Sequence, residues 1–144
     1  FAPDMGQECL ALYDAWAKER QQKHVDEIYR YLLEENRDVH ASVFEHYQDL
    51  GIIGRVIIID GRIRGYTFGY PQNDQVFCVL LEVVDLSLKG AAVYVFQRFC
   101  ADAAVQSFPF INAMEDMMSP AMEKTKMSFR PVVLLPSFVI TRKK

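Results

Sequence analysis

The stretch VFCVLLEVVDLSLKGAA, residues 76–92, decides the fold class of this chain. Residues 76–84 are apolar except for Glu82, and a nearly continuous apolar run of this length is typical of a central strand covered on both faces. Ser87 and Gly90 mark a turn, after which apolar residues recur at helical spacing as far as residue 103. The stretch therefore predicts a buried strand that leads through a short loop into a helix.

The segments on either side extend this unit into a sheet. Residues 108–112 form a short apolar run after the helix, and a strand-helix-strand connection places its second strand parallel to the first. Before it, a β-branched run at 56–59, the turn pair Asp60-Gly61 and the run 63–70 predict a β-hairpin. We expect residues 132–135 and 138–141 to close the sheet. The predicted sheet is mixed and mostly antiparallel.

Helical spacing dominates the first third of the chain. Apolar residues between residues 4 and 36 predict two amphipathic helices joined at 18–24, and a third helix is expected from Asp38, as its N-cap, to Gly51. A short helix is expected to open at Ser119-Pro120. A sheet flanked by helices defines an α/β (α+β) fold class. Because no repeat or linker interrupts the pattern, residues 1–144 are interpreted as a single domain.

Composition excludes several classes of protein. The chain has 144 residues, 51% of them hydrophobic, which is enough to build a substantial core. Its 16 Lys plus Arg against 19 Asp plus Glu give a formal net charge of -3, so no global positive field draws it onto nucleic acid. No apolar run is long enough to span a bilayer. Three widely spaced cysteines predict buried thiols in the cytoplasm, and the histidines lack the spacing of a metal site.

Five segments resemble one protein family: GIIGRV at 51–56, GYTFGY at 65–70, FCVLLEVVD at 77–85, FINAMED at 110–116 and KTKMSFRP at 124–131. Together they resemble the phosphatidylglycerol lysyltransferase C-terminal family, whose bacterial members commonly carry two acyltransferase-like modules in tandem. The order of elements is similar to the acetyltransferase (GNAT) fold without its first strand. The resemblance implies transfer of an acyl or aminoacyl group, with aminoacyl-tRNA as donor in the lysyltransferase branch.

The same resemblance predicts how the chain is organised and what it contacts. Nothing ahead of Asp4 supplies the first strand of a GNAT-like sheet, so we expect the chain to be the C-terminal half of a longer two-module protein. The expected partner is the N-terminal GNAT-like module of that protein or a second copy of this chain. Transfer RNA is a further candidate partner.

The loop after the predicted central strand is the candidate cofactor site. Acyl-CoA enzymes of the GNAT fold bind the pyrophosphate there on backbone amides, through an Arg/Gln-x-x-Gly-x-Gly/Ala loop that faces a helix N-terminus. In this chain Gly90 and Ala92 match the pattern, Ser87 replaces the larger polar residue, and Lys89 is the nearby cation. The alternative interpretation is an ordinary strand-to-helix turn with Ser87 as the N-cap.

Two carboxylates on the central strand are candidates for chemistry. Glu82 interrupts a buried run, which is costly unless the carboxylate is paired or functional, so it is a candidate for proton transfer. The alternative is a salt bridge to Arg62, Arg64 or Lys126. Asp85 ends the strand, where open α/β sheets usually bind ligands, and is a candidate substrate-binding residue.

Polar side chains that follow the next strand are the remaining acidic and amide candidates. We expect Asn112, Glu115 and Asp116 to lie beside Asp85 at one end of the sheet. Asn112 and Asp116 match the family's recurring motif and are candidate catalytic residues, whereas Glu115 is a candidate for substrate binding. The alternative is that Asn112 and Asp116 hydrogen-bond the backbone of a tight turn.

A small basic cluster is the candidate phosphate-binding surface. Lys126 and Arg130, together with Lys124, are suited to the phosphate of a tRNA end, of CoA or of a lipid headgroup. The alternative is a solvated helix face that neutralises nearby acids. Two functions therefore compete: a transferase that moves an acyl or aminoacyl group from acyl-CoA or aminoacyl-tRNA to an amine or hydroxyl, and a non-catalytic module that packs against its partner half.

Overall fold

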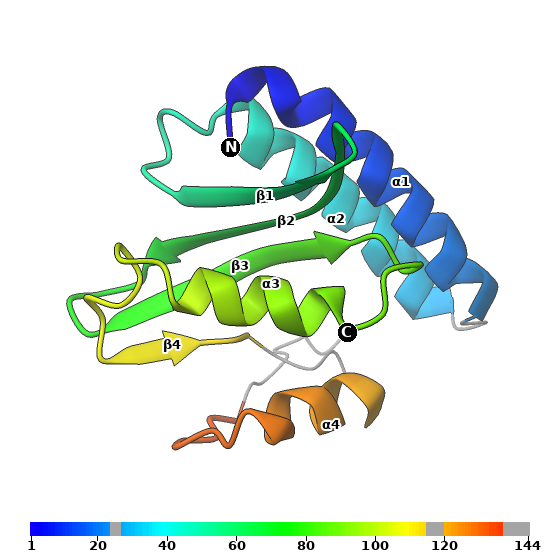
Figure 1. Cartoon of the computed structure of the whole chain (residues 1–144). Helices are drawn as coiled ribbons and strands as arrows, with labels where there is room; N and C mark the ends of the chain where they lie inside the picture. Colours follow the sequence, from blue (N-terminus) through cyan, green and yellow to red (C-terminus); the bar gives the residue numbers. More distant parts are fainter. Residues whose placement is uncertain (24–26, 115–119, 137–144) are drawn as a thin grey trace, which may run out of the picture. The chain divides into compact units, whose positions relative to one another are not determined.

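The computed structural model of the chain describes all residues except 24–26, 115–119 and 137–144. After a 3₁₀ turn, Pro3–Met5, the elements are α1 Gly6–Lys23, α2 Glu27–Glu45, β1 Ile53–Ile59, β2 Arg62–Pro71, β3 Val76–Val84, α3 Ala91–Cys100, β4 Phe110–Asn112 and α4 Pro120–Ser128 (Figure 1). The chain divides into two compact units, Phe1–Asn112 and Ala113–Lys144. Each unit is described by itself.

The first unit is built on a four-stranded mixed sheet in the order β1-β2-β3-β4. The pairs β1/β2 and β2/β3 are antiparallel, while β4 is parallel to β3 and follows it through α3. This confirms the predicted hairpin and the predicted crossover. At the hairpin turn Asp60 and Gly61 both have positive φ, 52° and 73°, which is the backbone that the Asp-Gly pair favours.

The sheet is covered on both faces, as the apolar run of β3 predicts. Figure 1 shows α1 and α2 on one face and α3 on the other. The core on the α1–α2 face contains Cys9, Tyr13, Ala17, Val43, Phe44, Ile63, Tyr66, Phe68 and Val83. The core on the α3 face is smaller and contains Phe77, Val79, Phe99 and Val105.

A β-bulge in β3 changes which face its residues point to. Phe68 pairs with Leu81, but the next residue, Gly69, pairs with Val79, so Leu80 is an extra residue in the strand. Gly69 is required beside the bulge, because a Cβ there would lie 2.5 Å from the carbonyl oxygen of Cys78. The alternation of side chains is therefore reversed after Leu80, which moves Glu82 to the α3 face.

Three predictions about secondary structure are wrong. Two separate helices are expected between α1 and Gly51, but the structure has one continuous helix there, α2. Asp38 lies inside this helix rather than at an N-cap. Residues 18–23, expected to be a connection, are the last turns of α1. Residues 132–135 form no strand and are 61% to 83% exposed, so an apolar β-branched run did not suffice to predict sheet pairing. The strand expected at 138–141 lies outside the described residues.

A buried polar contact joins α2 to the sheet. The side chain of His40 is 5% exposed, and its Nδ1 atom lies 2.8 Å from the hydroxyl oxygen of Tyr66, which is fully buried. The Tyr13 ring packs on His40 at 4.4 Å between ring centroids. Burial lowers the pKa of His40 to about 4, because the apolar surroundings disfavour the charged imidazolium. His40 is therefore neutral at physiological pH.

We expect the free energy of unfolding to fall as the pH is lowered from 7 towards 4. In the unfolded chain His40 has a pKa of about 6.5, so between pH 6.5 and 4 the unfolded state binds a proton that the folded state excludes. Each pKa unit corresponds to about 1.4 kcal/mol. Urea unfolding across this range measures the effect. His40→Gln should flatten the pH dependence, whereas His46→Gln, at an exposed histidine, should leave it unchanged; equal slopes in all three proteins would contradict this.

Candidate functional site

The loop between β3 and α3 is shaped by Asp85. Its Oδ1 atom accepts hydrogen bonds from the Ser87 amide at 2.8 Å and the Ser87 hydroxyl at 2.6 Å, and its backbone carbonyl accepts one from the Leu88 amide at 3.1 Å. Arg64 Nη1 lies 3.1 Å from Asp85 Oδ2. The hydrogen bonds from Ser87, and then the charge of Arg64, hold the pKa of Asp85 below its ordinary value. Asp85 is thus an ionised anchor of the loop and is poorly suited to accept a proton.

Gly90, and not Ser87, is the N-cap of α3. Gly90 has φ 79° and contributes no side-chain cap, so the first amides of the helix are left for another partner. The amide of Ala91 bonds the Leu88 carbonyl at 3.2 Å, and Ala92 is exposed in the first helical turn. The Ser87 N-cap interpretation is therefore wrong. The loop presents backbone donors at a positive helix end, which favours an anion.

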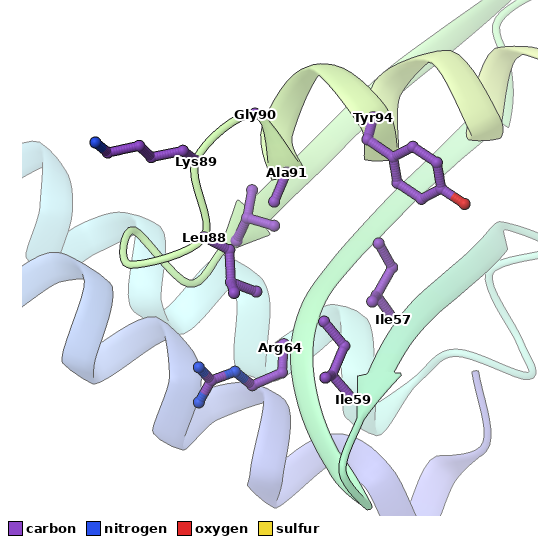
Figure 2. A pocket seen from close by; sticks show the side chains of 9 residues that line it. Ile57, Ile59, Arg64, Leu88, Lys89, Gly90, Ala91 and Tyr94 are labelled. Carbon is purple, nitrogen blue, oxygen red and sulfur yellow. The ribbon is translucent and has the colours of Figure 1, made fainter.

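A pocket with a cavity volume of about 280 Å³ adjoins this loop. Its walls are provided by β1, β2, the end of β3 and the start of α3, and its lining residues are Ile57, Ile59, Arg64, Val84, Leu88, Lys89, Gly90, Ala91 and Tyr94. Figure 2 shows Arg64 and Lys89 on the side of the loop and Tyr94 on the opposite side. The pocket is apolar inside, with two cations at one end. We call it the loop pocket.

Two residues of the loop pocket were missed in the sequence, Arg64 and Tyr94. Ile57 pairs with Gly65 whereas Ile58 pairs with Ile63, so Arg64 is the extra residue of a second bulge, in β2. The bulge turns its side chain towards Asp85. A regular alternation of apolar and polar residues does not reveal a bulge, so the sequence suggested Arg64 only as a partner for Glu82. Its ion pair goes to Asp85 instead.

Glu82 lies on the α3 face and is half-buried. It is the cross-strand neighbour of Thr67 on β2. Burial, and next the negative charge of Glu82, raise the pKa of Cys100 to about 11, which places the carboxylate close to the end of α3. Glu82 therefore places a carboxyl group beneath the helix and remains a candidate for proton transfer.

The structure does not bring Asn112 to Asp85. Asn112 pairs with Cys78, near the start of β3, and its Nδ2 atom donates to Gln72 Oε1 at 3.2 Å. Six residues of strand separate Cys78 from Asp85, a distance of about 20 Å. The predicted cluster is wrong on this point because β4 is short and pairs with the beginning of β3. Glu115 and Asp116 lie outside the described residues.

Because β4 pairs with only three residues of β3, it also leaves part of one edge of β3 without a strand partner in the described parts of the chain. Only Val76, Phe77 and Cys78 pair with β4, so from Val79 onwards that edge of β3 has no strand partner in the described parts of the chain. Backbone amides and carbonyls along an unpaired strand edge are available to a ligand. Within the described ranges, the two parallel strands therefore leave the edge of β3 between Leu80 and the loop without a strand partner.

The basic residues are described within the unit Ala113–Lys144. Lys126 Nζ donates to the carbonyl oxygens of Ala113 and Met114, the second at 3.1 Å. Lys124 and Arg130 are exposed, and Arg130 follows α4 with φ 53°. Lys126 is thus engaged by the backbone of its own unit, and Lys124 and Arg130 are the better candidates for phosphate contacts.

In the described ranges, no group of three or more His, Cys, Asp or Glu side chains is arranged to hold a metal ion. None of the described helices is both long and apolar enough to cross a bilayer.

Solved acetyltransferases share this fold. The chain superposes on a ribosomal-protein-alanine N-acetyltransferase from Brucella melitensis biovar Abortus 2308 with a TM-score of 0.65 at 15% identity, covering 99% of this chain and 96% of that one. It superposes on a possible acetyltransferase from Clostridium difficile 630 with a TM-score of 0.65 at 12% identity, covering 100% and 95%. The fold is therefore that of the GNAT acetyltransferases, as predicted.

The family follows from the sequence match. The family model "Phosphatidylglycerol lysyltransferase, C-terminal" matches residues 1–141. The chain therefore belongs to the phosphatidylglycerol lysyltransferase C-terminal family. A conserved protein of unknown function from Bacteroides thetaiotaomicron VPI-5482 superposes with a TM-score of 0.77 at 28% identity, covering 93% of this chain but only 43% of that one. This chain thus spans less than half the length of that relative. No curated protein sequence matches it.

We expect Arg64→Gln to loosen the loop without unfolding the domain. The variant loses the ion pair with Asp85, while the hydrogen bonds between Asp85 and Ser87 remain. The amides of Ser87 and Leu88 should exchange with solvent about twofold to fivefold faster, the equivalent of one partly exposed ion pair. Arg62→Gln, which removes an exposed arginine from the same strand, is the control. Identical exchange in both variants, measured by NMR, would show that Arg64 does not hold the loop.

Proposed function

We propose that this chain is a transferase module that moves an acyl or aminoacyl group from a thioester or ester donor to an amine or hydroxyl acceptor. The observation that carries the proposal is the loop from Asp85 to Gly90, which offers uncapped helix amides beside a pocket that contains Arg64 and Lys89. Such a loop suits the phosphate of a donor, because its backbone amides lie at the positive end of a helix. The family and the fold support a transferase of this type.

The chemistry proposed is direct attack of the acceptor on the donor carbonyl. The acceptor loses a proton, a bond forms to the carbonyl carbon, and the thiolate or alkoxide of the donor leaves with a proton. A backbone amide on the unpaired stretch of β3 is proposed to stabilise the oxyanion that develops on the carbonyl oxygen. Glu82, on the same stretch of strand, is the proposed proton acceptor, and Asn112 is placed too far along the sheet to assist at the loop.

The hydrogen bonds of the loop side chains bear on the choice of donor. Ser87 is bonded to Asp85, so the side-chain contact that a larger polar residue gives to a pyrophosphate is missing, and the grip on acyl-CoA rests on backbone amides and Lys89. We therefore propose aminoacyl-tRNA as the better donor, with Lys124 and Arg130 as phosphate contacts. The free thiols of Cys9, Cys78 and Cys100 support a cytoplasmic location for this chemistry.

A non-catalytic role is the second candidate. It is favoured by one observation: Asp85 and Ser87, two of the predicted site residues, satisfy each other and hold the loop instead of facing a ligand. In that case the module would serve to pack against the rest of a longer protein.

We expect acetyl-CoA to bind with a dissociation constant near 1 mM or weaker, and charged tRNA to bind more tightly. Binding of tRNA should weaken as salt rises, because each phosphate contact releases counterions, and Arg130→Gln should reduce the slope of log K against log salt by about 0.7 to 0.9. Isothermal titration at several salt concentrations measures both. Arg62→Gln is the control for a general loss of charge.

Other outcomes of the titration decide between the alternatives. Tight acetyl-CoA binding that depends little on salt and is lost in Gly90→Glu would replace tRNA with acyl-CoA as the donor. Absence of binding by both donors would support the non-catalytic role.

We also propose that the outer edge of β1 is covered by a strand from the remainder of a longer, two-module protein. β1 is an end strand of the sheet, and Ile58 and Ile59 at its end are 53% and 41% exposed. It contains no proline or lysine to discourage pairing, and its single charge, Arg55, is bound to Asp102. The Bacteroides relative, of which this chain covers 43%, has the additional length to supply such a strand.

Hydrogen exchange checks this interface. In the longer protein, the outward-facing amides of residues 56–59 should exchange at least about tenfold more slowly than in this chain alone, because a paired strand shields them. The amides of β2, which are paired in either case, serve as the internal control. Equal exchange at residues 56–59 in the two proteins would rule out strand pairing at this edge.

A further inference from the structure

A second pocket lies on the α3 face, further along the helix. It has a cavity volume of about 250 Å³ and is formed by β1, β2 and the second half of α3. It shares Ile57 and Tyr94 with the loop pocket but extends away from the loop towards Asp102. We call it the Thr67 pocket. No residue of the loop from Asp85 to Gly90 lines it, so it is separate from the proposed donor site.

A buried hydroxyl without a partner lines this pocket. The side chain of Thr67 is 1% exposed, and its Oγ1 atom has no hydrogen-bond partner among the residues that the structure describes. Burying a hydroxyl without a partner costs free energy, and valine would fill the same volume without that cost. The described residues therefore leave this buried hydroxyl without a polar partner.

Two arginines stand at the rim of the pocket. Arg55 is held in place because its Nε donates to Asp102 Oδ2 at 2.8 Å and its Nη1 donates to the Gly54 carbonyl at 2.9 Å. Asp102 is in turn fixed by the Ala104 amide at 3.0 Å. Arg98 lies on α3, one turn before Asp102, which follows the end of the helix. Arg98 is exposed and makes no ion pair within the described part of the chain. The three charged side chains leave one positive charge uncompensated, at Arg98.

We propose that the Thr67 pocket binds a small carboxylate that carries a neutral polar group, such as a hydroxyl, at its other end. The carboxylate pairs with Arg98 at the rim, where the planar guanidinium matches its two oxygens. The hydroxyl reaches Thr67, which both donates and accepts. Ile57 and Val95 provide the apolar walls between the two polar ends.

The order of the two polar ends follows from the charges on either side. Glu82 is the cross-strand neighbour of Thr67, so a negative group next to Thr67 would be repelled. A neutral hydroxyl at that depth meets no such penalty, and the negative end of the ligand lies by the arginines. The volume is below that of a drug-sized site, which limits the ligand to a small molecule.

NMR titration of the whole chain with three small molecules tests the proposed ligand class. The probes are 6-hydroxyhexanoate, hexanoate, which lacks the hydroxyl, and 1,6-hexanediol, which lacks the charge. We expect 6-hydroxyhexanoate to bind with a dissociation constant of about 1 mM, with shifts at the amides around Thr67 and Arg98, and the other two to bind several-fold more weakly.

Two variants separate the two ends of the ligand. Thr67→Val should weaken 6-hydroxyhexanoate to the level of hexanoate and leave hexanoate unchanged, while raising the melting temperature by about 3 °C because the unpaired hydroxyl is gone. Arg98→Gln should weaken both carboxylates and leave the diol unchanged. Arg62→Gln is the matched control and should change nothing.

Three results would overturn the proposal. They are the absence of binding by every probe, a preference for the hydroxyl that survives in Thr67→Val, and carboxylate affinities that survive in Arg98→Gln. Because the loop pocket is not involved, loss of donor binding in Gly90→Glu leaves these expectations in place.

Discussion

The bulge at Leu80 is the feature on which the rest of the site depends. A strand alternates its side chains between two faces, and one extra residue exchanges the faces for everything that follows. Before the bulge Phe77 and Val79 pack beneath α3, and after it Val83 joins the core against α1 and α2. Without the extra residue Glu82 would point into that aromatic core. The bulge therefore permits a carboxylate on a strand that is otherwise buried.

The sequence predicts the fold correctly where a local pattern is compatible with only one structure. Asp60-Gly61 between two β-branched runs predicted the hairpin, and the apolar run before Gly90 predicted the central strand and its crossover. It does not predict features that depend on which residues of two strands pair with each other. Nothing in the apolar pattern shows that β4 pairs only with the start of β3, so Asn112 was placed at the wrong end. The bulges at Arg64 and Leu80 also leave no signal in the sequence. Each interrupts the two-residue alternation of side chains along a strand without changing the composition of the strand.

The candidate site shows why side-chain motifs describe this loop poorly. The sequence makes Asp85 and Ser87 candidate ligand contacts, whereas in the structure they form a hydrogen-bonded turn that Arg64 anchors to β2. The groups left for an anion are main-chain amides around Gly90, whose positive φ only glycine adopts without strain. Recognition by the main chain leaves few constraints on the identity of the surrounding side chains. The proposed anion site therefore depends on the backbone conformation at Gly90 more than on the polar side chains of the loop.

Tyr94 and Ile57 form a common wall between the loop pocket and the Thr67 pocket. Two occupants that share a wall are linked thermodynamically: if one of them shifts the Tyr94 ring, the affinity for the other changes, and the change is the same in both directions. Because Tyr94 is 57% exposed, its ring meets little steric resistance to such a shift. Coupling through the Tyr94 side chain would require no rearrangement of the sheet.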